Sequence, residues 1–274
     1  GVRAVRVYRQ FAADHPDFDG VLLHGPHDRL SHGTSVYGIV FGNGARDGDG
    51  DPRAEGLLAC AEQGTFGDKD EVTDRYAHTE ELLDEPYRAA FQTNSWGHSR
   101  TAAYDSYSHE MDDIVFRLDL PITQSQSNSG DEASRPEAWA KNVISVGGVQ
   151  HTNTLDTGDD FWGGFTSIGP AEDGRIKPDL CYWADNIFTT YNVGYRPDFN
   201  GTSAATPQVA GVLGLVIQMW SENVWGTDPV GDTVFDRRPH AATAKALLIN
   251  AARPYPFSGA DDDLTRVHQG WGRP

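Results

Sequence analysis

The feature that most constrains this chain is a serine placed shortly before a long apolar segment. Gly201-Thr202-Ser203 precedes Val209 to Ile217, in which every residue is Val, Ala, Gly, Leu or Ile. Such a segment predicts a buried helix, so the fold has to bring the start of a helix, and Ser203 with it, next to the core. In a first helical turn, free backbone N–H groups and the positive end of the helix dipole would favour negative charge beside Ser203.

The residues around Ser203 support a role as a nucleophile. They are small, which leaves room for a substrate backbone, and Pro207 fits a helix start because proline is tolerated in a first turn and disrupts a helix further in. The alternative is a helix that begins at a Thr/Ser cap and uses its glycines only for packing.

Two other segments carry side chains suited to the same chemistry. His32 precedes Gly33-Thr34 and a small, apolar stretch, so its imidazole would be held at a helix start with space beside it, as a general base requires. Asn128 follows an apolar run that ends near Ile122, and its amide at a strand end could donate to an oxyanion. Taken singly, a capping histidine and an Asn-Ser-Gly turn are the alternatives.

In this order and spacing, the segments resemble those of the subtilisin-like serine proteases, the subtilase family. Ser31 to Ile39 is similar to the histidine motif of that family, and Asn200 to Pro207 to its serine motif. Four further stretches are similar to a substrate-binding strand, the oxyanion asparagine, a structural stretch ahead of the serine and the closing segment of the family; these are Thr93–Gly97, Ser127–Gly130, Phe165–Asp179 and His268–Gly272.

The resemblance implies a three-layer α/β fold with a mainly parallel central sheet flanked by helices. It covers nearly all of residues 1–274, so we expect a single subtilisin-like peptidase domain that is truncated at both ends. In the larger bacterial branch of the family, which the chain resembles most, a β-rich domain follows the segment that ends at Gly272.

The resemblance also implies a catalytic role for each motif. Ser203 would attack the scissile carbonyl of a peptide or protein substrate, His32 would act as the base, and Asn128 would stabilise the oxyanion. The substrate would lie as an extended strand between Ser95-Trp96-Gly97 and Ile122 to Ser127, with Ser125 and Ser127 among its contacts.

One element departs from the family pattern. The family carries a catalytic aspartate upstream of the histidine, and counting back from Asp14-His15-Pro16-Asp17 places Tyr8 at that position. Either the protein is a catalytically impaired, peptide-binding relative, or the first dozen residues are not the natural sequence. Asp156-Thr157-Gly158 is no substitute, because it lies after the oxyanion segment, and we interpret it as a loop turn.

Composition excludes several classes of function. The chain has 40 Asp and Glu against 22 Lys and Arg, a net charge of −18, which argues against a nucleic-acid partner. The apolar run Val209 to Ile217 is too short and too rich in glycine to insert into a membrane. Cys60 and Cys181 are expected to be free, buried thiols. The resemblance implies a secreted or extracellular protein.

We expect no required cofactor, although a structural calcium ion is possible and the identity of any metal ligand is unknown. Asn43 to Asp51 contains alternating aspartates, whose oxygens suit Ca²⁺, and subtilases often bind calcium. A solvated turn is the alternative. The acidic stretch from Asp68 to Glu80 is interpreted as a surface segment.

Short apolar or β-branched runs alternate with helical patterns, which independently predicts an α/β fold with a mainly parallel sheet. The carboxyl ends of such strands are where ligands bind, and His32, Asn128 and Ser203 would meet there. The predicted strands are Val5–Tyr8, Thr93–Trp96, Pro121–Ser125 and Val143–Val149, and the predicted helices are Ser35–Phe41, Asp105–Leu118, Pro136–Ala140, Thr202–Trp220 and Ala241–Ala252.

Overall fold

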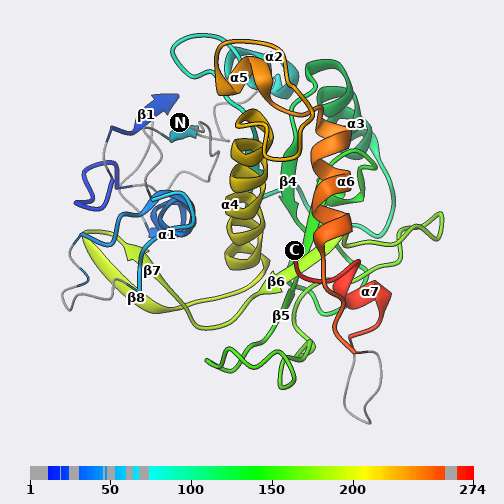
Figure 1. Ribbon diagram of the computed structural model, residues 1–274. Helices are drawn as coiled ribbons and strands as arrows, with labels where there is room; N and C mark the ends of the chain where they lie inside the picture. The colour runs from blue at the N-terminus through cyan, green and yellow to red at the C-terminus, as the bar shows by residue number, and fades with distance from the viewer. Residues whose placement is uncertain are drawn as a thin grey trace.

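The computed structural model describes most of the chain, and a parallel sheet lies at its centre (Figure 1). The predicted strand Val5–Tyr8 falls outside the described part. The described residues are 12–18, 20–24, 31–45, 47, 53–59, 64–67, 74–256 and 264–274.

Four parallel strands form the central sheet in the order β3-β4-β5-β6. They are β3 (Gln92–Asn94), β4 (Ile122–Ser125), β5 (Ile144–Val149) and β6 (Leu180–Trp183). The strands β3 to β5 are buried along their whole length, as expected for a parallel sheet covered on both faces. The predicted α/β fold with a mainly parallel sheet is therefore confirmed, although β3 ends before Ser95 and Trp96.

Helix α4 (Thr202–Ser221) covers one face of this sheet, with α1 (Ser31–Phe41) and α6 (Ala241–Ala251) beside it (Figure 1). The predicted apolar segment supplies the contact, because Val209, Leu213 and Ile217 are fully buried in the same core cluster as Val146 of β5. Burying side chains of this size stabilises the fold by about 1.5–3 kcal/mol each. The start of α4 is thereby fixed relative to the ends of the strands.

The opposite face of the sheet packs against α3 (Ser106–Leu118), which Asp105 caps through the backbone N–H groups of Tyr107 and Ser108. Met111 and Ile114 of this helix join Ile122 of β4 in a second core cluster. Helices on both faces complete the three layers that the resemblance implied. The predicted helix at Pro136–Ala140 is a single 3₁₀ turn, η1 (Pro136–Trp139).

The patterns in the sequence did not predict several short elements. The most important is the antiparallel hairpin of β7 (Ile187–Tyr191) and β8 (Gly194–Phe199), which turns at Asn192 with a left-handed φ of 51°. The other short elements are strand β6 of the central sheet, the parallel pair β1 (Leu22–His24) and β2 (Thr65–Gly67), and the helices α2 (Arg75–Glu81), α5 (Val234–Arg237) and α7 (Arg266–Gln269).

Three interpretations from composition can be compared with the described residues. No helix in that part of the chain is both long enough and apolar enough to cross a membrane. Cys181 is a free, buried cysteine as expected, whereas Cys60 lies outside the described residues. The acidic stretch from Asp68 to Glu80 is more than a surface segment, because its residues from Arg75 onward belong to α2 and the side chain of Arg75 is buried.

Candidate active site

The position of His32 is set by the way α1 lies against strand β7. Thr190 Oγ1 donates to the carbonyl oxygen of Thr34 over 2.7 Å, and Ser35 Oγ donates to the carbonyl oxygen of Thr190 over 2.8 Å. A Cβ at Gly38 would lie 2.0 Å from Thr190 Oγ1, so glycine is needed for this close approach. The helix begins at Ser31 rather than at the predicted Ser35, and this places His32 in its first turn.

The imidazole of His32 lies beside the segment that leads into Ser203. Its ring meets the ring of Phe199 edge to face, with centroids 5.5 Å apart, and Phe199 is the last residue of β8. The Arg196 guanidinium lies 5.5 Å from the centroid of the same Phe199 ring. Burial, and then the charge of Arg196, lower the pKa of His32 from 6.5 to about 4. At neutral pH the imidazole is uncharged, which is the state that accepts a proton.

Asn128 holds the start of α4. Its Oδ1 accepts a hydrogen bond of 2.9 Å from the backbone N–H of Thr202, one of the N–H groups for which the helix itself has no partner. Gly201 precedes it with φ of 85°, and a Cβ there would lie 2.9 Å from both Oδ1 and Nδ2 of Asn128. Within the described residues, Nδ2 has no hydrogen-bond acceptor, so this amide donor is available to a ligand beside Ser203.

The residue before Asn128 is fastened to the same helix start. The backbone N–H of Ser127 donates to Thr202 Oγ1 over 3.2 Å, and Arg100 Nε donates to Ser127 Oγ over 2.7 Å. Ser127 has φ of 121°, a region that non-glycine residues rarely adopt. These bonds keep the backbone in that conformation and aim the following Asn128 at the helix. Thr202 therefore joins the segment of Ser127 and Asn128 to the start of α4. In the sequence, only its position directly before Ser203 indicated this role.

Ser203 is tied to Ser95 by a pair of contacts. Ser95 Oγ donates to the carbonyl oxygen of Ser203 over 3.1 Å, and Ser203 Oγ lies 3.4 Å from the carbonyl oxygen of Ser95. The prediction that Pro207 lies in the first turn is wrong, because α4 begins at Thr202 and Pro207 falls in its second turn. Since proline has no N–H, the carbonyl of Ser203 loses its helical partner, and Ser95 replaces that partner.

The path expected for a substrate needs one correction. Ile122, Thr123 and Gln124 pair directly with Gln92, Thr93 and Asn94, so no peptide can lie between β3 and β4 at that level. The pairing of the two segments ends at Asn94 and Gln124, and Ser95-Trp96-Gly97 and Ser125 to Ser127 follow these residues. Any extended peptide would have to bind past the carboxyl ends of the strands, which is also where Asn128 lies.

The described part of the chain gives two aspartates, Asp156 and Asp17, other roles than that of a catalytic acid. Asp156 is exposed, and its Oδ1 accepts from the backbone N–H of Gly158, which confirms the interpretation as a loop turn. Asp17 is buried, and both of its oxygens accept from the hydroxyl of Tyr195. Tyr8 itself lies outside the described residues.

Among the residues that the structure describes, no three His, Cys, Asp or Glu side chains are grouped so as to hold a metal ion. In the loop of alternating aspartates, Asp47 Oδ2 accepts from the backbone N–H of Ala54. Asp49 and Asp51 lie outside the described residues, so the calcium hypothesis stays a prediction.

A first prediction concerns the charge of His32. Because burial lowers its pKa, its ring signals in a histidine NMR titration should change with a midpoint near pH 4. Since the folded pKa lies below the unfolded value of 6.5, His32 contributes stability above pH 6.5 that is lost as the pH falls towards 4. A His32→Asn variant should lose less stability over that interval. A midpoint near 6.5 in the folded protein would contradict this assignment.

A second prediction concerns Gly201. In Gly201→Ala the new Cβ clashes with Asn128 and the backbone keeps a left-handed φ, so we expect a loss of about 1–3 kcal/mol in unfolding free energy. Gly194→Ala is the matched control, because nothing lies within 4 Å of a Cβ at that position. Chemical denaturation measures both, and equal stabilities would show that Asn128 does not pack against the start of α4 in this way.

Known proteins resemble this chain in sequence and in fold. The sequence profile of the subtilase family matches residues 14–272. The serine protease AprX of Bacillus subtilis (strain 168) is 25% identical over an alignment of 245 residues. The alignment covers 74% of this chain and 54% of AprX, so the chain spans about half the length of that relative.

Two solved structures show the likeness in fold. The prenylagaramide maturation protease PagA has a TM-score of 0.70 at 22% identity, over 98% of this chain and 89% of PagA. A cold-adapted subtilisin-like serine proteinase has a TM-score of 0.63 at 18% identity, over 98% of this chain and 86% of that one. Because the family profile extends over nearly the whole chain, this protein belongs to the subtilase family.

Proposed function

We propose that the protein is a serine endopeptidase that hydrolyses peptide bonds through an acyl-enzyme. The observation that carries this proposal is the meeting of Asn128 with the start of α4, beside Ser203. Membership of the subtilase family and the relationship to the serine protease AprX support it. No cofactor takes part in the proposed reaction.

In the proposed mechanism, Ser203 Oγ attacks the scissile carbonyl carbon while His32 takes its proton. The carbonyl oxygen becomes an oxyanion and accepts from Asn128 Nδ2 and from the backbone N–H of Ser203, in the first turn of α4. The protonated imidazole then gives its proton to the leaving amine. Water attacks the acyl-enzyme by the reverse sequence and frees Ser203. The low pKa of His32 keeps the base ready for the first of these steps.

The proposed substrate is a peptide or protein in extended form. Its backbone would pair with Ser95, Trp96 and Gly97 on one side and with Ser125 and Ser127 on the other, beyond the paired parts of the two strands. The family supports a secreted or extracellular location.

The alternative is an impaired, peptide-binding relative, and the presence of Tyr8 at the expected aspartate position favours it. In subtilisin, loss of the aspartate alone lowers kcat roughly 3 × 10⁴-fold, while the rest of the site leaves residual catalysis. An impaired protein would therefore still react slowly at Ser203. The two functions differ in rate, and both predict bound peptide in the same place.

A third prediction separates the two functions. A fluorophosphonate should label Ser203, with the position identified by peptide mass spectrometry, and the rate should fall by orders of magnitude in His32→Ala, because an unassisted hydroxyl is a weak nucleophile. Restoring the acid with Tyr8→Asp and Gln10→Gly should raise the rate by orders of magnitude, since a carboxylate would orient the imidazole and stabilise its charged form.

The control for this experiment is Ser203→Ala, which removes the reacting oxygen and should not be labelled. If the restored variant is folded and still reacts no faster than Ser203→Ala, a missing acid is not the defect. The endopeptidase proposal then fails in favour of peptide binding.

A further inference from the structure

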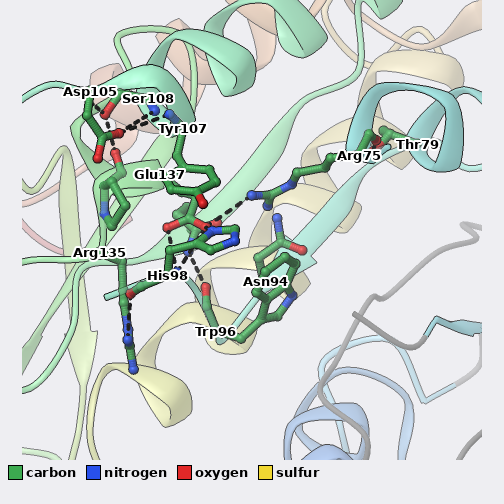
Figure 2. A network of polar contacts seen from close by, with 12 residues as sticks. Arg75, Thr79, Asn94, Trp96, His98, Asp105, Tyr107, Ser108, Arg135 and Glu137 are labelled. Atoms are coloured by element: carbon green, nitrogen blue, oxygen red, sulfur yellow. Dashed lines mark hydrogen bonds and ion pairs between the residues drawn. The ribbon is translucent and has the colours of Figure 1, made fainter. Parts of the chain in front are cut away.

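A buried carboxylate lies directly behind the segment proposed to bind substrate. Glu137, in η1, is fully buried, and Figure 2 shows Arg75 reaching toward it from α2 and His98 approaching from the segment that follows β3. Arg75 Nη1 lies 3.2 Å from Glu137 Oε1. His98 Nδ1 lies 2.8 Å from the same oxygen, and the backbone N–H of His98 donates to Oε1 over 3.1 Å and to Oε2 over 3.2 Å.

The charges of this cluster balance one another. Burial alone would raise the pKa of Glu137, but the hydrogen bonds from His98 and the charge of Arg75 outweigh it and hold that pKa below its usual value. A buried ion pair is weak evidence for stability, since apolar side chains of the same volume stabilise a core as well or better. Stability alone therefore does not explain why this cluster lies behind the segment proposed to bind substrate.

The contacts of the cluster converge on three consecutive residues, Trp96, Gly97 and His98. A Cβ at Gly97 would lie 2.5 Å from Glu137 Oε2, so the carboxylate packs directly against the backbone of Gly97. The Arg75 guanidinium lies 4.5 Å from the centroid of the Trp96 ring. Arg135 Nη1 donates to the carbonyl oxygen of His98 over 2.7 Å (Figure 2). The backbone from Trp96 to His98 is thus held from behind.

The other end of these residues reaches the candidate nucleophile. Ser95 donates to the carbonyl oxygen of Ser203, and the carbonyl oxygen of Trp96 accepts from Gln124 Nε2 over 2.6 Å. The imidazole of His98 stacks on the ring of Tyr107 of α3, with centroids 3.7 Å apart and planes 12° apart. Residues 95–98 therefore form a fixed edge between Ser203 and three separate helical elements.

We propose that Glu137, together with Arg75, is a positioning residue that holds residues 95–98 in the conformation with which a peptide substrate pairs. This inference rests on the proposed function. A fixed edge lowers the cost of ordering when a peptide binds along it. Residues of the peptide that lie away from the scissile bond should therefore bind more tightly. A small reagent that reaches only Ser203 should not depend on the fixed edge.

The test compares two inhibitors that react with the same serine. Acetyl-phenylalanine diphenyl phosphonate carries one residue, and succinyl-Ala-Ala-Ala-Phe diphenyl phosphonate extends along the edge. We expect the extended inhibitor to label Ser203 faster. The ratio of the two rates should fall about tenfold in Glu137→Gln, as expected when one or two hydrogen bonds are lost, while the one-residue rate stays within about twofold.

A second variant guards against a failure to fold. Glu137→Gln leaves Arg75 buried without its carboxylate, which is strongly destabilising in general, whereas Arg75→Gln with Glu137→Gln leaves no buried charge. The double variant should lower the same ratio. His109→Ala is the matched control, because His109 is an exposed histidine of α3 outside the cluster. It should leave both rates unchanged.

The affinity of Ser203→Ala protein for the peptide succinyl-Ala-Ala-Ala-Phe gives a measure that needs no reaction. It should weaken about tenfold when the double substitution is added, by the same loss of hydrogen bonds. Equal affinities, an unchanged ratio, or equal slowing of both inhibitors would overturn the positioning role. Failure of every protein to be labelled would instead contradict the proposed function, and the affinities would still decide this inference.

Discussion

The hydrogen bond from the Thr202 N–H to Asn128 Oδ1 is the interaction on which the candidate site depends. A helix leaves the N–H groups of its first turn without internal partners, and here an amide from a distant loop satisfies one of them. The bond is possible because Gly201 lets Asn128 approach without a Cβ in the way. It sets the Asn128 amide and Ser203 at the same helix start, with the helix dipole directed at both.

Ser95 also holds this helix start in place, although α4 loses one internal hydrogen bond. Pro207 removes a hydrogen bond from the second turn of α4, and the carbonyl of Ser203 is satisfied by Ser95 instead. This hydrogen bond from Ser95 also links α4 to residues 95–98, the edge proposed to bind substrate. On the other side, the β7–β8 hairpin contacts α1 through Thr190, and the imidazole of His32 lies against Phe199, which precedes Ser203 by four residues.

The sequence predicted the parts of this arrangement that depend on local pattern. The apolar run after Ser203 gave the buried helix α4, and the short β-branched runs gave three of the four strands of the central sheet. It did not predict contacts between segments far apart in the chain. Nothing in the pattern around Glu137 indicates that Arg75, 62 residues earlier, is its partner. The hairpin was missed because its residues show no regular alternation. Pro207 was assigned to the first turn because proline favours that place, although the predicted helix start at Thr202 already puts it in the second turn.

The central claim is that two groups donate to the same oxyanion, the Asn128 amide and the backbone N–H of Ser203 in the first turn of α4. A crystal structure of the protein after reaction with a phosphonate inhibitor tests this most directly, because the phosphonyl oxygen stands in for the oxyanion. The account predicts phosphorus on Ser203 Oγ, with the phosphonyl oxygen within about 3 Å of both Asn128 Nδ2 and the Ser203 N–H, and His32 facing the adduct. A phosphonyl oxygen directed away from Asn128, or an inhibitor attached to another residue, would contradict it.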